Sequence, residues 1–142
     1  MIIDQINPDV EVMSFDFDVL EAGNYDLKVV NVEQSETSNG NTKFTWTLEP
    51  IAPISELVNA EGEEVKKLGK IFYDTIMTEK AQWRLKALVE GAGLAYEPGL
   101  DTDELLNKEV RAYVTIKREY TDKNGAIVAL KTPRNEVSKI LK

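Results

Sequence analysis

The strongest constraint on the fold is the strict alternation of apolar and polar residues over residues 109–119, EVRAYVTIKRE. The apolar residues share one face of an extended chain: Val110, Ala112, Val114 and Ile116. A repeat of two residues is typical of a β-strand with one buried face and one face toward solvent. The alternation therefore predicts that this segment is a core strand of a sheet.

Further strands and one helix are predicted on either side of this segment. The strands are expected at residues 25–34, 42–49, 70–76 and 126–131, with residues 135–141 extending or closing the sheet. Asn-Gly pairs at 39–40 and 124–125 are hairpin turn signals. Residues 78–94 carry apolar residues at helical spacing, with Thr78 as the expected N-cap and with Gly91 and Gly93 at the end.

The order of these elements predicts a mainly β fold with one central helix. Three strands, a helix and a two-stranded hairpin follow each other as in a five-stranded OB-type barrel, with the helix between strands three and four. Other small mixed β folds share this order. We expect residues 1–24 to form an acidic arm and residues 25–142 to form the OB-like domain.

The composition argues against several classes of protein. The chain of 142 residues has no histidine and no cysteine, so it lacks the residues of ordinary zinc sites and of Ser-His-Asp or Cys-His catalytic groups. We therefore expect a protein that is not an enzyme and that needs no cofactor. No apolar run approaches the roughly 18 residues of a membrane-spanning helix, so no membrane association is expected.

Charge is distributed unevenly along the chain. The net charge is −8, yet residues 1–64 hold 14 acidic and 2 basic residues, whereas residues 65–142 hold 11 acidic and 15 basic residues. This asymmetry suggests a local anion-binding surface on a protein that otherwise repels polyanions. Solubility and chance clustering are the alternative explanation.

The polar face of residues 109–119 is the main candidate for binding. Cations interleaved with aromatic rings are typical of single-stranded nucleic-acid sites, where cations neutralise phosphates and rings stack on bases. A solvated strand face is the alternative. Bases are expected on Tyr113 and Tyr120, and on Phe72 if it faces outward; Phe72 as a core residue is the favoured alternative. The full candidate set is Lys43, Lys70, Phe72, Arg111, Tyr113, Lys117, Arg118, Tyr120, Lys131 and Arg134.

Two groups of acidic residues are candidate metal ligands. Asp16 and Asp18 form one group, and Asp101, Asp103 and Glu104 form the other. Neither matches an EF-hand loop, so caps and solvated faces are the preferred interpretation and no metal site is predicted.

Trp83 lies opposite the apolar stripe of the predicted helix, at about 100° per residue. We expect this ring to be covered by the chain itself, either by Val12, Phe15 or Phe17 of the arm or by residues 50–58. Contact with a base or with a partner protein is the alternative.

Several segments of the chain resemble a phage family thought to consist of OB-fold single-stranded-DNA-binding proteins. The resemblance rests on residues 22–33, 71–94, 103–114 and 134–141, and its most specific part is the Trp-Arg-Leu-Lys helix after the Phe-Tyr-Asp strand. It implies sequence-nonspecific binding of single-stranded DNA during phage replication or recombination, in the host bacterial cytoplasm. Phage replication or recombination proteins would be further partners, and the sequence does not decide between a monomer and a homodimer. The alternative is a phage structural or host-interaction protein that uses its acidic arm.

Overall fold

The computed structural model describes residues 2–6, 8, 17–122 and 124–141, and it describes residues 131 and 132 by their backbone alone. The strands are β1 (Gly23–Glu36), β2 (Thr42–Pro50), β3 (Ile71–Ile76), β4 (Glu109–Thr121) and β5 (Ile127–Leu141). The α-helix α1 spans Gln82–Gly91, and two short 3-10 helices span Ile54–Glu56 (η1) and Thr102–Leu105 (η2). None of the described helices is long and apolar enough to cross a membrane.

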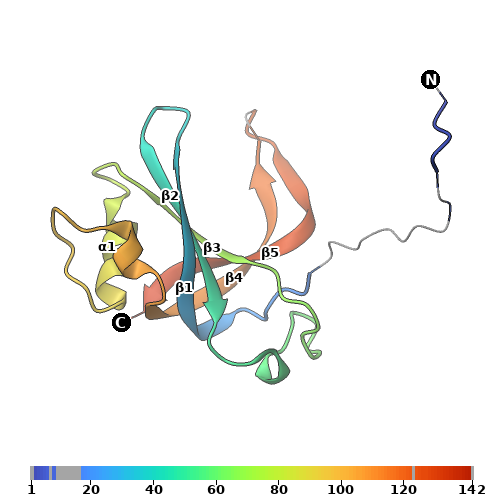
Figure 1. Cartoon of the computed structure of the whole chain (residues 1–142), viewed down its shortest axis with the longest axis horizontal. Helices are drawn as coiled ribbons and strands as arrows, with labels where there is room; N and C mark the ends of the chain where they lie inside the picture. The colour runs from blue at the N-terminus through green and yellow to red at the C-terminus, as the bar shows by residue number, and fades with distance from the viewer. Residues whose placement is uncertain (1, 7, 9–16, 123, 142) are drawn as a thin grey trace.

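The five strands form a closed ring in the order β1-β2-β3-β5-β4 (Figure 1). β4 pairs with β1 and closes the ring, from Gly23 opposite Val114 to Lys28 opposite Glu109. β3 and β5 run parallel, with Phe72 opposite Glu136, and all other neighbours are antiparallel. The prediction of a mainly β fold with one α-helix between the third and fourth strands is confirmed.

The interior of the ring is apolar because each strand turns alternate residues inward. Leu48, Ile71 and Val114 are fully or almost fully buried, and so is the ring of Trp46. The indole N–H of Trp46 donates a hydrogen bond to the hydroxyl of Thr75 at 3.0 Å, so that both buried polar groups are satisfied. The predicted inward residues of 109–119 are confirmed except for Ile116, which is half-buried beside a register shift between β4 and β5.

The helix packs its apolar stripe against β3, β4 and β5. Leu85, Leu88 and Val89 are buried, as the helical spacing predicts. A Cβ atom on Gly91 would lie 2.7 Å from Ile140, which explains why the helix ends on a glycine at this close approach to β5.

The predicted start of the helix was wrong. Thr78 is not the N-cap: the helix begins at Gln82 after Ala81. The hydroxyl of Thr78 instead accepts a hydrogen bond from the Ala81 N–H at 3.1 Å within a separate turn that joins β3 to α1. The Thr78 hydroxyl therefore stabilises the connecting turn and does not cap the helix.

The last residues of the predicted acidic arm enter the folded body. Leu20 is fully buried, and its backbone N–H and C=O bond to the side-chain amide of Asn135 at 2.7 and 3.1 Å. Asp18 and Leu20 form isolated bridges with Leu68 and Asn59. Residues 9–16 lie outside the described residues.

Candidate functional site

A shallow depression of about 250 Å³ lies on the outer face of β2, β3 and β5. Its position follows from strand periodicity: because Trp46, Tyr73 and Val137 point into the ring, the residues beside them point out. Six side chains line it, and a seventh, Lys117 of β4, reaches it through an ion pair. We call these seven residues the outer-face cluster: Lys43, Thr45, Phe72, Asp74, Lys117, Arg134 and Glu136.

Three ion pairs connect the charged side chains of the cluster. Lys43 Nζ lies 3.6 Å from Asp74 Oδ2, Lys117 Nζ lies 3.5 Å from Glu136 Oε1, and Arg134 Nη2 lies 3.3 Å from the same oxygen. All five side chains are partly exposed to solvent. Such pairs are typically worth only about 0.2–1 kcal/mol each, so the cations can exchange these partners for a stronger anion.

Phe72 lies in the middle of this surface, and the favoured alternative that placed it in the core was wrong. Ile71 and Tyr73 are buried, so the ring of Phe72 points outward, where it is half-buried. It lies between Thr47 of β2 and Glu136 of β5 in the sheet register. An outward aromatic ring flanked by charged side chains can receive a flat ligand such as a nucleobase.

Tyr113 and Arg111 share the outward face of β4 but lie farther along it. Tyr113 is 39% exposed and opposite Lys139 of β5. Arg111 pairs with Asp26 of β1 at 3.7 Å and lines a separate cavity of about 1090 Å³ beside Gly91. The structure therefore does not bring Arg111 into the cluster.

Of the remaining predicted residues, Lys70, Arg118 and Tyr120 do not line the depression. Arg118 and Tyr120 are exposed in the outer part of the β4–β5 hairpin. Lys131 is part of β5, where the structure describes its backbone but not its side chain. Lys70 is exposed one residue before β3, beside Val30.

Sequence reasoning missed Glu136 and did not assign Asp74 a role. Both carboxylates lie on the outward face, at alternate positions from predicted site residues: Asp74 follows Phe72 by two, and Glu136 follows Arg134 by two. That spacing was the available signal. The position of Glu136 beside Lys117 depends on the register of β4 against β5, which contains shifts that the local hairpin signal does not indicate.

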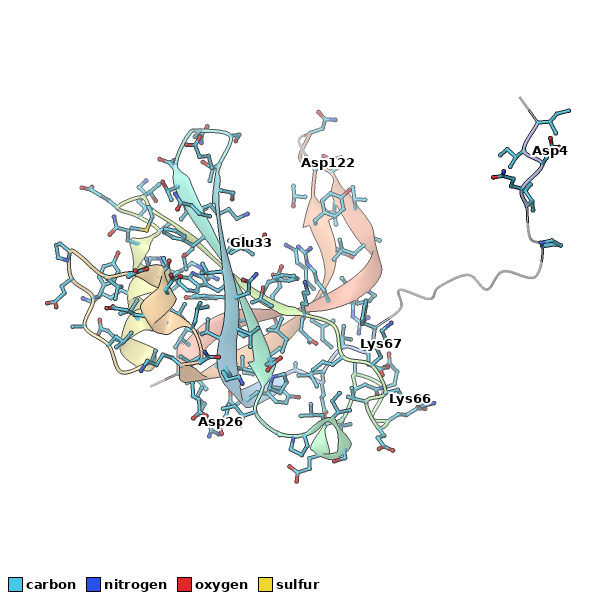
Figure 2. The ribbon with its side chains drawn as sticks, in the orientation of Figure 1. Asp4, Asp26, Glu33, Lys66, Lys67 and Asp122 are labelled. Carbon is cyan, nitrogen blue, oxygen red and sulfur yellow. The ribbon has the colours of Figure 1, made fainter. Side chains whose placement is uncertain are left out.

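Two hairpin loops project from the same side of the ring (Figure 1). They join β1 to β2 and β4 to β5. Figure 2 shows Asp122 at the tip of the second hairpin, where its carboxylate accepts hydrogen bonds from the N–H groups of Asn124 and Ala126 at 2.9 Å. The loop is therefore held by its own side chain.

Of the acidic candidates for metal binding, Asp18 and Asp101 accept hydrogen bonds from backbone N–H groups, and Asp103 and Glu104 are exposed. The Asp18 carboxylate accepts the backbone N–H groups of Lys66 and Lys67 at 2.7 and 3.2 Å, in the loop labelled in Figure 2. These bonds hold the pKa of Asp18 below its usual value. Asp101 accepts the N–H of Asp103 at 3.0 Å at the start of η2. Asp16 lies outside the described residues.

The prediction that Trp83 is covered by the chain was wrong. Its side chain is 60% exposed on the outer side of α1. Phe17, one of the expected covers, instead lies against Gly69 under the Lys67 ammonium group, 4.6 Å from the ring centroid. Val12 and Phe15 lie outside the described residues. The position of Trp83 off the apolar stripe is as the helical spacing predicts.

The sequence profile of one family, described as a protein of unknown function (DUF669), matches residues 7–139. The chain belongs to the DUF669 family. No curated protein matches the chain. The family match covers α1, β1 to β4 and all but the last two residues of β5, but its description assigns no activity to a DUF669 protein.

Proposed function

We propose that this chain is a sequence-nonspecific single-stranded-DNA-binding protein with an OB-type barrel. In keeping with the resemblance seen in the sequence, it would protect single-stranded DNA during phage replication or recombination in the host bacterial cytoplasm. The observation that carries the proposal is the convergence of Lys43, Lys117 and Arg134 around the outward ring of Phe72.

The topology supports this proposal. Barrels of the OB type bind oligonucleotides on the face of strands two and three and on the loops that join strands one to two and four to five. The outer-face cluster takes its central residues from β2 and β3. The two corresponding hairpin loops project on one side of the ring (Figure 1). The position of the cluster therefore agrees with the ligand face of this barrel type.

The chemistry of the cluster also supports single-stranded nucleic acid. A base stacked on Phe72 would leave its phosphates within reach of cations on both sides, from β2 and from the β4–β5 pair. Stacking is sequence-tolerant because every base has a flat face, and it is worth about 1–3 kcal/mol per base. Thr45 and the two carboxylates add hydrogen-bonding groups beside the ring.

The test is a fluorescence-anisotropy titration with labelled oligo-dT at rising salt. For single strands the logarithm of the binding constant falls with a slope of about −0.7 per neutralised phosphate, so three cations predict a slope of roughly −2. Changing Lys43 to alanine should weaken binding and reduce the slope by about 0.7.

Lys28→Ala is the matched control for the Lys43 variant. Both lysines lie on strands and pair with a carboxylate across the sheet, Lys28 with Glu49 at 3.8 Å and Lys43 with Asp74 at 3.6 Å. Lys28 lies outside the cluster, so its variant should bind as the wild type does. Equal effects of the two changes, or no binding of oligo-dT by the wild type, would refute the proposed site.

A second candidate function, contact with another protein through the N-terminal arm, is favoured by one observation. Ile2, Ile3 and Ile6 are 87%, 72% and 66% exposed. Exposed apolar residues in a short segment are typical of contact sites for partner proteins. Replacing the three isoleucines with serine should abolish binding of a phage replication protein at high salt and leave oligo-dT binding unchanged. A triple variant that retains the protein partner would exclude this role for the arm.

A further inference from the structure

Trp83 is the most exposed aromatic side chain among the described residues, and its surroundings are ordered. At 60%, its exposure exceeds the 42% of Tyr120 and the 39% of Tyr113. The guanidinium carbon of Arg84 lies 5.7 Å from the centroid of the Trp83 ring and 4.3 Å from the centroid of Tyr73. Both distances are within the range of cation–π interactions. The cation therefore contacts a buried ring and an exposed ring together.

Arg84 is fixed by hydrogen bonds as well as by the two rings. Its Nε donates to the backbone carbonyl of Asp74 at 3.0 Å, and its own carbonyl accepts the hydroxyl of Tyr73 at 2.7 Å. These contacts tie the start of α1 to the middle of β3. Trp83 therefore lies on a helix turn that these contacts hold in place, so ligand binding costs little conformational entropy in this turn.

This first turn of α1, with Trp83 and Arg84, is next to the outer-face cluster. Asp74, whose carbonyl accepts the Arg84 Nε–H, pairs through its side chain with Lys43 at 3.6 Å. A continuous series of contacts therefore runs from Trp83 through Arg84 and Asp74 to Lys43. An extended strand that stacks on Phe72 and follows β3 toward its C-terminal end would next meet α1.

We propose that Trp83, together with Arg84, forms an additional base-stacking subsite that extends the outer-face cluster onto α1. The inference rests on the proposed function, because it assumes a single strand as the ligand. A flat exposed ring beside a fixed cation suits a nucleobase and its phosphate. The exposed side chain of Lys80 adds a second cation before the helix.

The two tryptophans of the chain make the subsite directly observable. Trp46 is fully buried and bonded to Thr75, so a ligand on the surface does not reach it. Quenching of tryptophan fluorescence by saturating oligo-dT would therefore report on Trp83. The Trp83→Phe variant should lose this quenching but keep much of the affinity, because a phenyl ring still stacks.

Oligonucleotide length separates the subsite from the cluster. Oligo-dT of about 4 and about 16 nucleotides spans the range of site sizes for one OB-type domain. Trp83→Ala should weaken binding of the longer oligonucleotide by roughly 5- to 150-fold, as expected for one lost stacking contact, and should change binding of the shorter one little. Lys86→Ala, an exposed change on the same helix, is the control and should affect neither.

The outcomes distinguish the subsite from the proposed function. If Lys43→Ala and Arg134→Ala weaken binding but Trp83→Ala binds the longer oligonucleotide as the wild type does, the subsite is overturned and the proposed function stands. Equal losses for both lengths would also overturn the subsite, because the ring would then act within the cluster. If the wild type binds neither oligonucleotide, both proposals fail.

Discussion

Replacing Glu136 with glutamine is predicted to strengthen single-strand binding, although the change removes two ion pairs. The Glu136 carboxylate lies 3.5 Å from Lys117 Nζ and 3.3 Å from Arg134 Nη2, so it occupies the position that a phosphate would take between these cations. Glutamine keeps the shape and removes the charge. The sign of the effect depends on whether the carboxylate positions the cations or competes with the phosphate.

The magnitudes favour competition. Each partly exposed ion pair is worth about 0.2–1 kcal/mol, which limits what the carboxylate contributes by holding the cations in place. Two like charges 4 Å apart repel by about 1 kcal/mol in bulk water and by about 4 kcal/mol at the effective dielectric constant near a protein surface. Removing the carboxylate should therefore improve binding by about 1–2 kcal/mol at low salt, which is roughly 5- to 30-fold.

The assay is oligo-dT binding followed by fluorescence anisotropy at two salt concentrations. The advantage of Glu136→Gln should shrink as salt rises, because the repulsion is screened over about 10 Å at 0.1 M salt. Glu49→Gln is the control, since Glu49 pairs with Lys28 outside the cluster. A folded Glu136→Gln protein that binds no more tightly than the wild type at low salt would refute this reasoning. The carboxylate would then be a contact for a base, or the cluster would not be the site.

Three further predictions concern single side chains. Asn135→Ala should lower the free energy of unfolding in urea by about 2–5 kcal/mol, because it leaves the buried N–H and C=O of Leu20 without partners; a loss below 1 kcal/mol would mean that water replaces the amide. Tyr113→Ala should weaken oligo-dT binding by about 1–3 kcal/mol at an unchanged melting temperature. Unchanged affinity would mean that Tyr113, which lies on β4 outside the outer-face cluster, does not contact the strand. Asp18→Asn should lower the melting temperature at neutral pH, and this difference should vanish at acid pH. Because hydrogen bonds lower the folded-state pKa of Asp18 below 3.8, its contribution is present above that value and lost as the pH falls through the folded-state pKa. A difference that persists at acid pH would exclude that explanation.

The elements with a clear period were predictable from the sequence. Val110, Ala112 and Val114 are buried as their alternation predicts, and Leu85, Leu88 and Val89 are buried as their helical spacing predicts. Such patterns report which side of one element faces the core, and that property is set by neighbours along the chain. The order of the elements along the chain followed from the same patterns.

The composition of the cluster was only partly predictable. The sequence indicates Lys43, Phe72, Lys117 and Arg134 as separate candidates, but it does not show that they meet, because they lie on four different strands. Their meeting depends on the antiparallel pairing of β4 with β5 and on the parallel pairing of β3 with β5. The β3–β5 pairing joins segments far apart in the chain, and the β4–β5 pairing contains register shifts that the hairpin signal at residues 124–125 does not indicate.

The exposure of Trp83 could not be predicted for a similar reason. The helical spacing correctly placed the ring away from the core, but whether a loop covers it depends on the path of segments elsewhere in the chain. Phe17 packs beside Gly69 instead, where the lack of a side chain leaves room for the ring. Large aromatic residues are mostly buried in folded proteins. The prediction that the chain covers Trp83 relied on this tendency, and it was wrong.

The charge balance of the molecule argues that stacking, more than electrostatics, would decide which nucleic acid is bound. The cluster holds three cations and two carboxylates on a chain with a net charge of −8. A duplex offers a dense array of phosphates but keeps its bases stacked inside, so it would gain little from this small excess of positive charge. A single strand can turn its bases onto Phe72, Tyr113 and Trp83, and each stacked base contributes about 1–3 kcal/mol. The acidic remainder of the surface would then repel both forms, and only the form with free bases would overcome that repulsion.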